Sequence, residues 1–414
     1  MTQSSPYRRE AIAVGKWKHM EMLGIYLSIP FCRSKCTYCN FSSGVFPASY
    51  HDRYISCIEK DLKRIRARAK QWRAQLPHAV DSIYLGGGTP SLLSPALLRR
   101  LFTAVRREFA VLPTAEVTVE CAPGQIDPAV LDALVECGVT RVSFGVQSFI
   151  DNEAKSIGRL HNRATALEDI RRVRAAGISD ISVDLIAGLP GQTLNSWYES
   201  LGVLVESRVD HASIYMLEVD DESRLGREML VNGGRYRAKE VPGDDLIAEF
   251  YTEAIGFLAG HGLAQYEISN FARTGCESRH NLKYWHRQSY LGLGLDAHSM
   301  LRIHSGAALR FATTDNLDHF LKDSGWQTPR PLNRDEEMEE AWFLGLRLNQ
   351  GVSLGALRQD FSASAVRGFL ATIGELEDEG LATFLDGDRV ALTARGRLLS
   401  NEVFERFLGE PAAA

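Results

Sequence analysis

Short runs of β-forming residues alternate with longer stretches of helical periodicity along the first half of the chain. The predicted strands cover residues 24–29, 82–86, 116–121, 140–146, 180–187 and 212–217. The predicted helices between them cover residues 47–69, 94–109, 128–137, 163–176 and 194–207. Parallel strands joined by right-handed helical crossovers form a sheet that curls toward a barrel. The sequence therefore predicts an α/β fold, a partial (β/α)6 barrel with its functional residues at the carboxyl ends of the strands.

The second half of the chain departs from this repeat. A predicted helix at 244–260 leads into a segment at 265–302 that is rich in glycine, histidine and aromatic residues, and we expect it to be irregular structure against the barrel. Amphipathic helices are then predicted at 334–348, 353–361 and 363–379, followed by a hairpin with an Asp386-Gly387 turn and a last helix. This order of elements predicts a winged-helix-like α+β appendage.

These changes of pattern divide the chain into four predicted parts. They are an N-terminal extension at 1–23, the barrel at 24–240, a barrel-capping segment at 241–330 and the C-terminal domain at 331–410. Residues 334–380 hold 4 Arg against 10 Asp or Glu, and this acidic balance would repel the phosphates of a nucleic acid. We therefore expect the appendage to be a structural or protein-contact module and not a DNA-binding one.

Composition excludes several other classes of protein. With 47 basic and 52 acidic residues the net charge is −5, so we expect no nucleic-acid partner. No run of about 18 apolar residues occurs, which predicts no transmembrane segment, while peripheral contact with a membrane surface is left open. Seven cysteines without a regular framework, and no apolar signal-peptide core, predict a cytoplasmic protein.

Three of the cysteines lie directly after the first predicted strand, with C-x3-C-x2-C spacing: Cys32, Cys36 and Cys39. So close a cluster indicates a metal site. A structural zinc ion would need a fourth ligand, and no nearby residue is an obvious candidate. Three thiolates suit a [4Fe–4S] cluster whose fourth iron stays open to a substrate. Tyr38 could pack beside an adenine brought to that iron, or be an ordinary packed aromatic.

The C-x3-C-x-aromatic-C motif together with the βα repeat resembles the radical S-adenosylmethionine (SAM) superfamily, and the predicted fold is then a partial radical SAM barrel. The resemblance implies that the open iron binds SAM. The turn Gly86-Gly87-Gly88-Thr89 resembles the GGGTP element, whose backbone contacts the methionine amino group of SAM.

Three further residues lie near the ends of predicted strands, and together with Arg163, which begins the predicted helix at 163–176, they match the chemical needs of SAM. Glu120, Gln147 and Asp184 could accept from ribose hydroxyls or an ammonium group, and Arg163 is the candidate that grips a carboxylate. Each could instead be a helix cap, a solvated charge or a hydrogen bond within the barrel.

Within the superfamily, the chain more closely resembles the oxygen-independent coproporphyrinogen III dehydrogenases and their HemW-type haem chaperone branch. Tyr26, in Tyr-x-x-Ile-Pro-Phe-Cys, belongs to that shared pattern. The dehydrogenases carry a fourth cysteine where this chain has Phe41, so the resemblance implies the chaperone branch. The segment His280-Asn281-Leu282-Lys283-Tyr284-Trp285 resembles the HNxxYW element associated there with haem. His280 is thus the first candidate haem ligand, and His298 and Cys276 are weaker alternatives.

The resemblance implies a haem chaperone that binds a [4Fe–4S] cluster, SAM and haem and transfers haem to acceptor apoproteins, with an electron donor as a further partner. No catalytic residue is assigned. The alternative is a dehydrogenase that decarboxylates coproporphyrinogen III to protoporphyrinogen IX by radical chemistry. A third hypothesis is a binding module in which the metal cluster is only structural.

Overall fold

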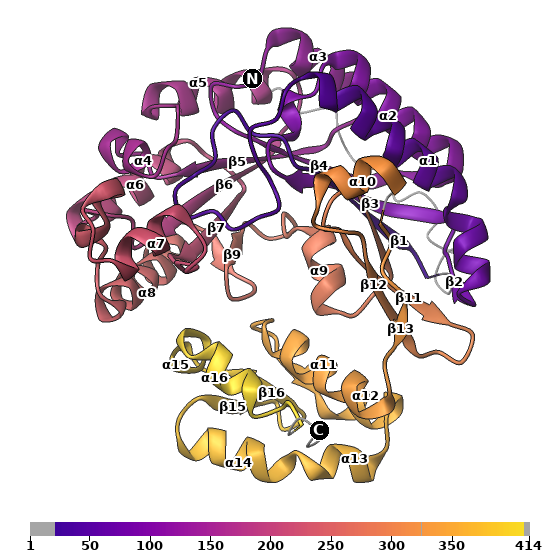
Figure 1. The fold of residues 1–414 in the computed structure, drawn as a ribbon. Coiled ribbons are helices and arrows are strands. Elements are labelled where there is room, and N and C mark those ends of the chain that lie inside the picture. Colours follow the sequence, from indigo (N-terminus) through magenta and orange to yellow (C-terminus); the bar gives the residue numbers. More distant parts are fainter. Residues whose placement is uncertain (1–20, 324, 410–414) are drawn as a thin grey trace, which may run out of the picture.

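The computed structural model describes residues 21–323 and 325–409, and its centre is a curved parallel sheet (Figure 1). Six strands lie side by side in chain order: β1 (Leu23–Ile29), β3 (Ala79–Gly87), β4 (Ala110–Cys121), β5 (Arg141–Gln147), β6 (Asp180–Ala187) and β7 (His211–Met216). All neighbouring pairs among them are parallel. The predicted order of strands is confirmed, although β4 begins earlier than its predicted bounds.

Helices cover the outer side of this sheet, as Figure 1 shows. The predicted ones are present as α1 (Ser49–Gln71), α2 (Pro95–Glu108), α3 (Pro128–Glu136), α5 (Arg163–Ala175), α6 (Leu194–Glu206) and α8 (Asp244–Gly260). Side-chain caps fix several starts, since Ser94, Asn162 and Thr193 each accept a hydrogen bond from a backbone N–H of the first turn. The short elements η2 (Pro90–Leu92), α4 (Asp151–Ser156), α7 (Arg224–Leu230) and η3 (Arg235–Glu240) were not predicted.

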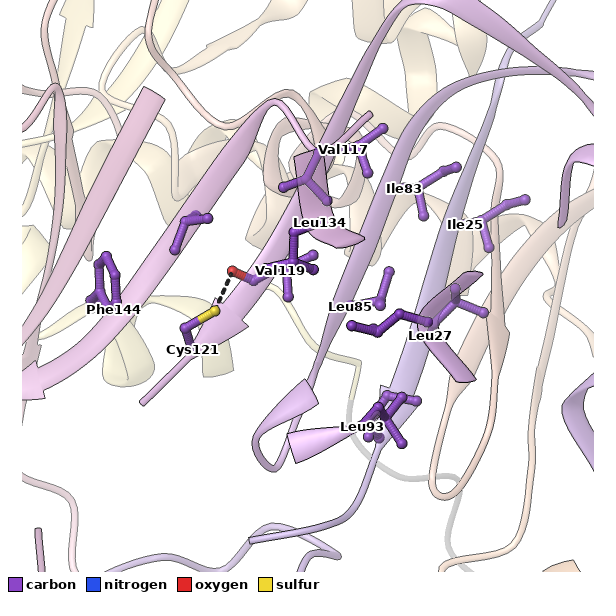
Figure 2. Close-up of a cluster of buried hydrophobic side chains, with 14 of the residues drawn as sticks. Ile25, Leu27, Ile83, Leu85, Leu93, Val117, Val119, Cys121, Leu134 and Phe144 are labelled. Carbon is purple, nitrogen blue, oxygen red and sulfur yellow. Dashed lines mark hydrogen bonds between the residues drawn. The ribbon is translucent and has the colours of Figure 1, made fainter. Parts of the chain in front are cut away.

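Apolar and polar side chains alternate along the strands, so the sheet has an apolar outer face and a polar inner face. Figure 2 shows the outer face, where Ile25 and Leu27 of β1 lie beside Ile83 and Leu85 of β3. These side chains are fully buried and pack in one hydrophobic core with the helices. The inner face carries polar or small residues at alternate positions, among them Ser28, Gly86, Glu120, Ser143, Asp184 and Ser213. A strand period of two thus directs the polar residues into the concave side of the sheet.

The sheet continues beyond the six repeat strands on both edges. Next to β1 lie β10 (Tyr290–Leu293), β11 (His298–Ile303), β12 (Ala308–Ala312) and β13 (Arg330–Pro331), with β2 (Ala74–Gln75) paired to β11. Next to β7 lie β9 (Asn270–Ala272) and β8 (Ala264–Gln265). Helices α9 (Arg279–Trp285) and α10 (Leu317–Asp323) belong to the same part of the chain. The prediction that 265–302 is irregular is therefore wrong, because its short apolar runs pair with strands distant in sequence.

The C-terminal part builds a second, smaller core. It contains α11 (Arg334–Leu346), α12 (Leu354–Asp360), α13 (Ala363–Gly368) and α14 (Leu370–Asp378), then α15 (Ala394–Leu398) and α16 (Ser400–Glu405). The helix predicted at 363–379 and the predicted last helix are each two helices. The three-stranded sheet is β14 (Val352–Ser353), β16 (Arg389–Leu392) and β15 (Ala382–Leu385), and the turn between β15 and β16 has Asp386 and Gly387 at positive φ, as the hairpin prediction requires.

The two cores meet through ion pairs. Glu337 and Glu340 of α11 pair with Arg302 and Arg310 at 2.8 and 2.7 Å. One hydrophobic core runs from Leu23 to Leu321 and so includes both the barrel and the segment after it, whereas a separate core lies between residues 338 and 407. The predicted boundaries at 24–240, 241–330 and 331–410 stay predictions, and most of the extension at 1–23 lies outside the described residues. Within the described chain, no helix is both long and apolar enough to pass through a bilayer.

Candidate functional site

A cavity of about 360 Å3 opens at the carboxyl ends of the parallel strands. Its volume falls in the range of about 300–1,000 Å3 that is usual for small-molecule sites. Ten of the predicted site residues line it: Cys32, Cys36, Tyr38, Cys39, Gly87, Gly88, Thr89, Glu120, Gln147 and Asp184. Residues from several strand ends and from the cysteine loop thus share one cavity.

The glycine turn after β3 supports the cysteine loop directly. The Gly88 N–H donates to the Ile29 carbonyl at 2.9 Å, and the Thr89 N–H donates to the Phe31 carbonyl at 2.8 Å. A Cβ on Gly88 would lie only 2.8 Å from both of those carbonyl oxygens. Gly88 is therefore required because the backbone leading to Cys32 packs against it.

The three cysteines present thiols to the cavity, and none of them is in a disulfide. Burial raises the pKa of the Cys32 and Cys39 thiols, so these two are protonated at neutral pH unless a metal takes the place of the proton. Arg159 Nη1 lies 3.5 Å from Cys36 Sγ, close enough to donate to that sulfur. Among the described residues no three His, Cys, Asp or Glu side chains already form a site for one metal ion. The fit to a metal cluster therefore rests on the donor chemistry and the shared cavity.

Glu120 and Asp184 bring two carboxyls to the floor of the cavity. Glu120 accepts from the Gly87 N–H at 3.1 Å and from the Tyr84 hydroxyl at 2.9 Å. Ser143 Oγ donates to Asp184 at 3.1 Å. Burial raises the pKa of Glu120 to about 7 and that of Asp184 to about 6. A cationic ligand between them would stabilise their charged forms.

Glu120→Gln tests the cost of that buried charge. Because the folded-state pKa of Glu120 lies above its ordinary value of 4.5, the unfolded chain loses this proton first as pH rises. The carboxyl therefore lowers the stability of the ligand-free wild type progressively between about pH 4.5 and 7. We expect the free energy of unfolding of Glu120→Gln, minus that of the wild type, to increase as pH rises through that window. The increase should reach up to about 1.4 kcal/mol per pH unit. Urea unfolding of the metal-free proteins at several pH values measures this, and parallel stability curves would contradict it.

Gln147 occupies an unusual backbone position where β5 ends. Its φ is 70°, in the left-handed region, and the pairing of β5 with β6 shifts register between Gly145 and Gln147. Its buried Oε1 has no hydrogen-bond partner among the described residues. A strained backbone and an unpaired acceptor at a cavity wall indicate a ligand that donates to this amide.

Tyr38 lies in the cavity wall, and two further predicted residues, Gly86 and Tyr26, lie just behind it. Tyr38 lines the cavity and packs on a small apolar cluster that includes Ile157 and Leu217. Gly86 lies below Glu120, and a Cβ there would approach Glu120 Oε1 to 2.9 Å. Tyr26 lies on the inner face of β1, and its hydroxyl would be 3.5 Å from a Cβ on Gly87. Tyr38 faces the cavity, whereas the other two shape it from outside its lining.

Arg163 lies away from the cavity. It is the first residue of α5, after the Asn162 cap, and its guanidinium binds Glu199 and the Phe149 carbonyl. Arg159, four residues earlier, lines the cavity instead and contacts both Cys36 Sγ and the Gly145 carbonyl. Arg159 was not predicted from the sequence; the signal that could have found it is that residue 163 begins the predicted helix at 163–176, whereas residue 159 lies in the loop before that helix.

His280 lies at the opposite end of the barrel. Its N–H and imidazole contact residues near the starts of β3 and β4, with Nδ1 2.9 Å from Ser82 Oγ and the backbone N–H 3.0 Å from Glu116. Nε2 lies 2.8 Å from the Tyr284 hydroxyl, and the residue is only 1% exposed. Burial lowers the pKa of His280 to about 3. Its role as a haem ligand stays a prediction, and in this arrangement both ring nitrogens are already engaged.

The remaining candidates differ in exposure. Phe41 lines the cavity and is 64% exposed. Cys276 lies near the start of β5, where its carbonyl accepts from Arg141 at 3.1 Å. His298 begins β11 and is exposed.

The chain is similar to known proteins over nearly its whole length. The sequence model of the Radical SAM superfamily matches residues 26–204, and that of the HemN C-terminal domain matches residues 332–399. The chain is 33% identical to "Heme chaperone HemW" of Bacillus subtilis over 94% of this chain and 100% of the relative. It is 32% identical to the protein of that name from Lactococcus lactis, over 92% of this chain and 96% of the relative.

One solved structure shares the whole fold. It is described as coproporphyrinogen III oxidase (HemN) from Escherichia coli, a radical SAM enzyme, and it matches with a TM-score of 0.80 and 23% identity. The match covers 94% of this chain and 90% of the other. At this identity the likeness shows a common fold, from the barrel through the C-terminal part.

Proposed function

This chain belongs to the HemW family of haem chaperones, within the radical SAM superfamily, and from that premise we propose that it binds haem and passes it to acceptor apoproteins. The observation that carries the proposal is that three thiols, a glycine turn and two carboxyls line one cavity in a chain similar to HemW proteins over nearly its whole length. Haem, acceptor apoproteins and an electron donor are its proposed partners, and we place it in the cytoplasm.

We propose that Cys32, Cys36 and Cys39 hold a [4Fe–4S] cluster in this cavity. A reduced cluster, when bound, supplies one electron to SAM. The chain itself contributes the rigid backbone beneath the loop, where Gly88 and Thr89 bond to the residues before Cys32. Arg159 adds a positive charge beside Cys36, with its Nη1 3.5 Å from that sulfur.

For SAM, the lining offers a partner for each polar group. We propose that Arg159 holds the carboxylate, and that Glu120, Gln147 and Asp184 share the ammonium group and the ribose hydroxyls. An arginine is suited to a carboxylate because its planar fork can donate two parallel hydrogen bonds. The raised pKa values of the two carboxyls would return toward normal on binding a cation.

The alternative is oxidative decarboxylation of coproporphyrinogen III. It is suggested by the shared fold with HemN, a likeness that shows the fold alone. Against it stands Phe41, at the position where the resembling dehydrogenases carry a fourth cysteine. A phenyl ring can neither ligate iron nor relay a proton, so this position does not support that chemistry here.

One experiment separates the proposed functions. The anaerobically reconstituted, reduced protein is incubated with SAM and either haemin or coproporphyrinogen III, and 5′-deoxyadenosine, porphyrin products and bound haem are followed together. We expect a haem Soret band on the protein, haem transfer to an added apoprotein such as apomyoglobin, and no protoporphyrinogen IX. Formation of protoporphyrinogen IX would establish the alternative. Absence of both haem binding and SAM cleavage would leave a binding module with a structural cluster.

A further inference from the structure

A second cavity, of about 310 Å3, lies outside the one described above. It is on the inner side of the extended sheet, where β1, β10, β11 and β12 face helices α9 and α11. In Figure 1 this region lies between the barrel and the C-terminal part. Its volume is at the lower end of the usual range for small-molecule sites, and the cavity is partly open to solvent, so a larger ligand would be only partly enclosed.

Four of the eight residues that line this cavity are Tyr or Trp. They are Tyr26, Tyr284, Trp285 and Tyr290. The Tyr284 and Tyr290 rings pack edge to face with their centroids 4.6 Å apart. The centroids of the Tyr284 and Trp285 rings are 6.2 Å apart. Leu344 of α11 adds an aliphatic surface from the C-terminal part. Such a wall suits a large, flat, aromatic ligand.

His298 brings a free imidazole to this cavity. Its side chain is 74% exposed, and it makes no hydrogen bond to any described residue. Its ion-pair partner is Asp296, with His298 Nε2 3.9 Å from the carboxyl oxygen. His280 and His211 differ, because both of their ring nitrogens lie within 3 Å of a hydroxyl. His298 is therefore free to donate a nitrogen lone pair to a metal.

Arg310 supplies a cation at the same wall. Its guanidinium holds Glu340 through two N–H groups and donates a third to the Tyr290 hydroxyl at 2.6 Å. This leaves one N–H on each terminal nitrogen, which suits a carboxylate substituent of a ligand.

We propose that this cavity is the haem subsite, with His298 as an axial ligand of the haem iron and Tyr284, Trp285 and Tyr290 packed on the macrocycle. The inference rests on the proposed haem chaperone function and adds where the haem lies. It assigns the aromatic part of the HNxxYW segment to packing on haem and moves iron ligation from the buried His280 to the exposed His298. Arg310 would hold a propionate.

The position of this subsite also connects it to the other cavity. The Tyr26 ring lines the second cavity, while its hydroxyl lies beside Gly87 of the turn that lines the first. Haem bound here would touch α11 through Leu344, so the C-terminal part would complete the site.

The test is haemin titration of the full-length protein, followed by the Soret band, for wild type, His298→Ala and the matched control His304→Ala. His304 is exposed on the turn after β11 and does not line the cavity. We expect the Kd of His298→Ala for haemin to rise by about tenfold or more, because even loss of a group that only supports a metal ligand costs about 10–100-fold. Free imidazole in the buffer should restore the wild-type spectrum to His298→Ala. His304→Ala should match the wild type.

Other outcomes would overturn the proposal in distinguishable ways. If the wild type binds and transfers haem and His298→Ala does so equally well with an unchanged spectrum, the subsite is wrong and the chaperone function stands. The same conclusion follows if His280→Ala loses the haem Soret band while circular dichroism shows that it is still folded, and His298→Ala keeps the Soret band. If the wild type gives no Soret change at all, the chaperone function and the subsite both fail.

Discussion

Replacing any one of Cys32, Cys36 or Cys39 with alanine should abolish the iron–sulfur cluster while leaving the chain folded. Each thiol would hold a different iron, and the cavity lining offers only these three and Cys121, whose thiol donates to the Val119 carbonyl at 3.9 Å (Figure 2). The wild type should take up about four irons and four sulfides per chain on anaerobic reconstitution. Iron and sulfide analysis with Mössbauer spectroscopy measures this directly.

Cys276→Ala is the matched control for that experiment. Cys276 is also a partly exposed free cysteine, but it lies near the start of β5, away from the cavity. We expect its variant to hold the same iron and sulfide as the wild type. A wild type that binds one zinc ion and no sulfide, or a Cys36→Ala variant with full iron content, would contradict the cluster assignment.

Arg159→Gln should weaken SAM binding by about 10- to 150-fold, whereas Arg163→Gln should leave it nearly unchanged. A hydrogen bond to a charged group contributes about 1.5–3 kcal/mol, and tenfold in Kd corresponds to about 1.4 kcal/mol. Arg159 faces the cavity, while Arg163 is engaged with Glu199 on the outside of the barrel. Calorimetric titration of SAM into the reconstituted variants checks the difference.

The two arginines also separate SAM binding from cluster assembly. Iron content measured on the same Arg159→Gln samples should stay near that of the wild type. Arg159 donates to Cys36 Sγ but would not itself be a ligand of iron. If Arg163→Gln lost SAM affinity and Arg159→Gln kept it, the original assignment of Arg163 would be right and the geometric one wrong.

Local pattern was sufficient for much of the fold. Strand runs with polar residues at alternate positions, helix caps such as Ser94 and Thr193, and the Asp386-Gly387 turn each encode their structure within a few residues. The C-x3-C-x2-C spacing is likewise sufficient to indicate a metal site. The strands within 265–302 were not predicted because β10 pairs with β1, more than 260 residues away in the sequence. No pattern in the residues around β10 indicates that partner.

The order of the βα units, the cysteine loop and the glycine turn after β3 were all predictable from local sequence, because each depends on neighbours in the chain. Tertiary structure alone decided which of Arg159 and Arg163 faces the cavity, and that His280 is buried while His298 is free. The physical reason is that facing and burial depend on what distant elements cover. The residue type decides which chemistry a side chain can perform. Whether a side chain such as His298 can reach a ligand depends on how β1, α9 and α11 pack around the second cavity.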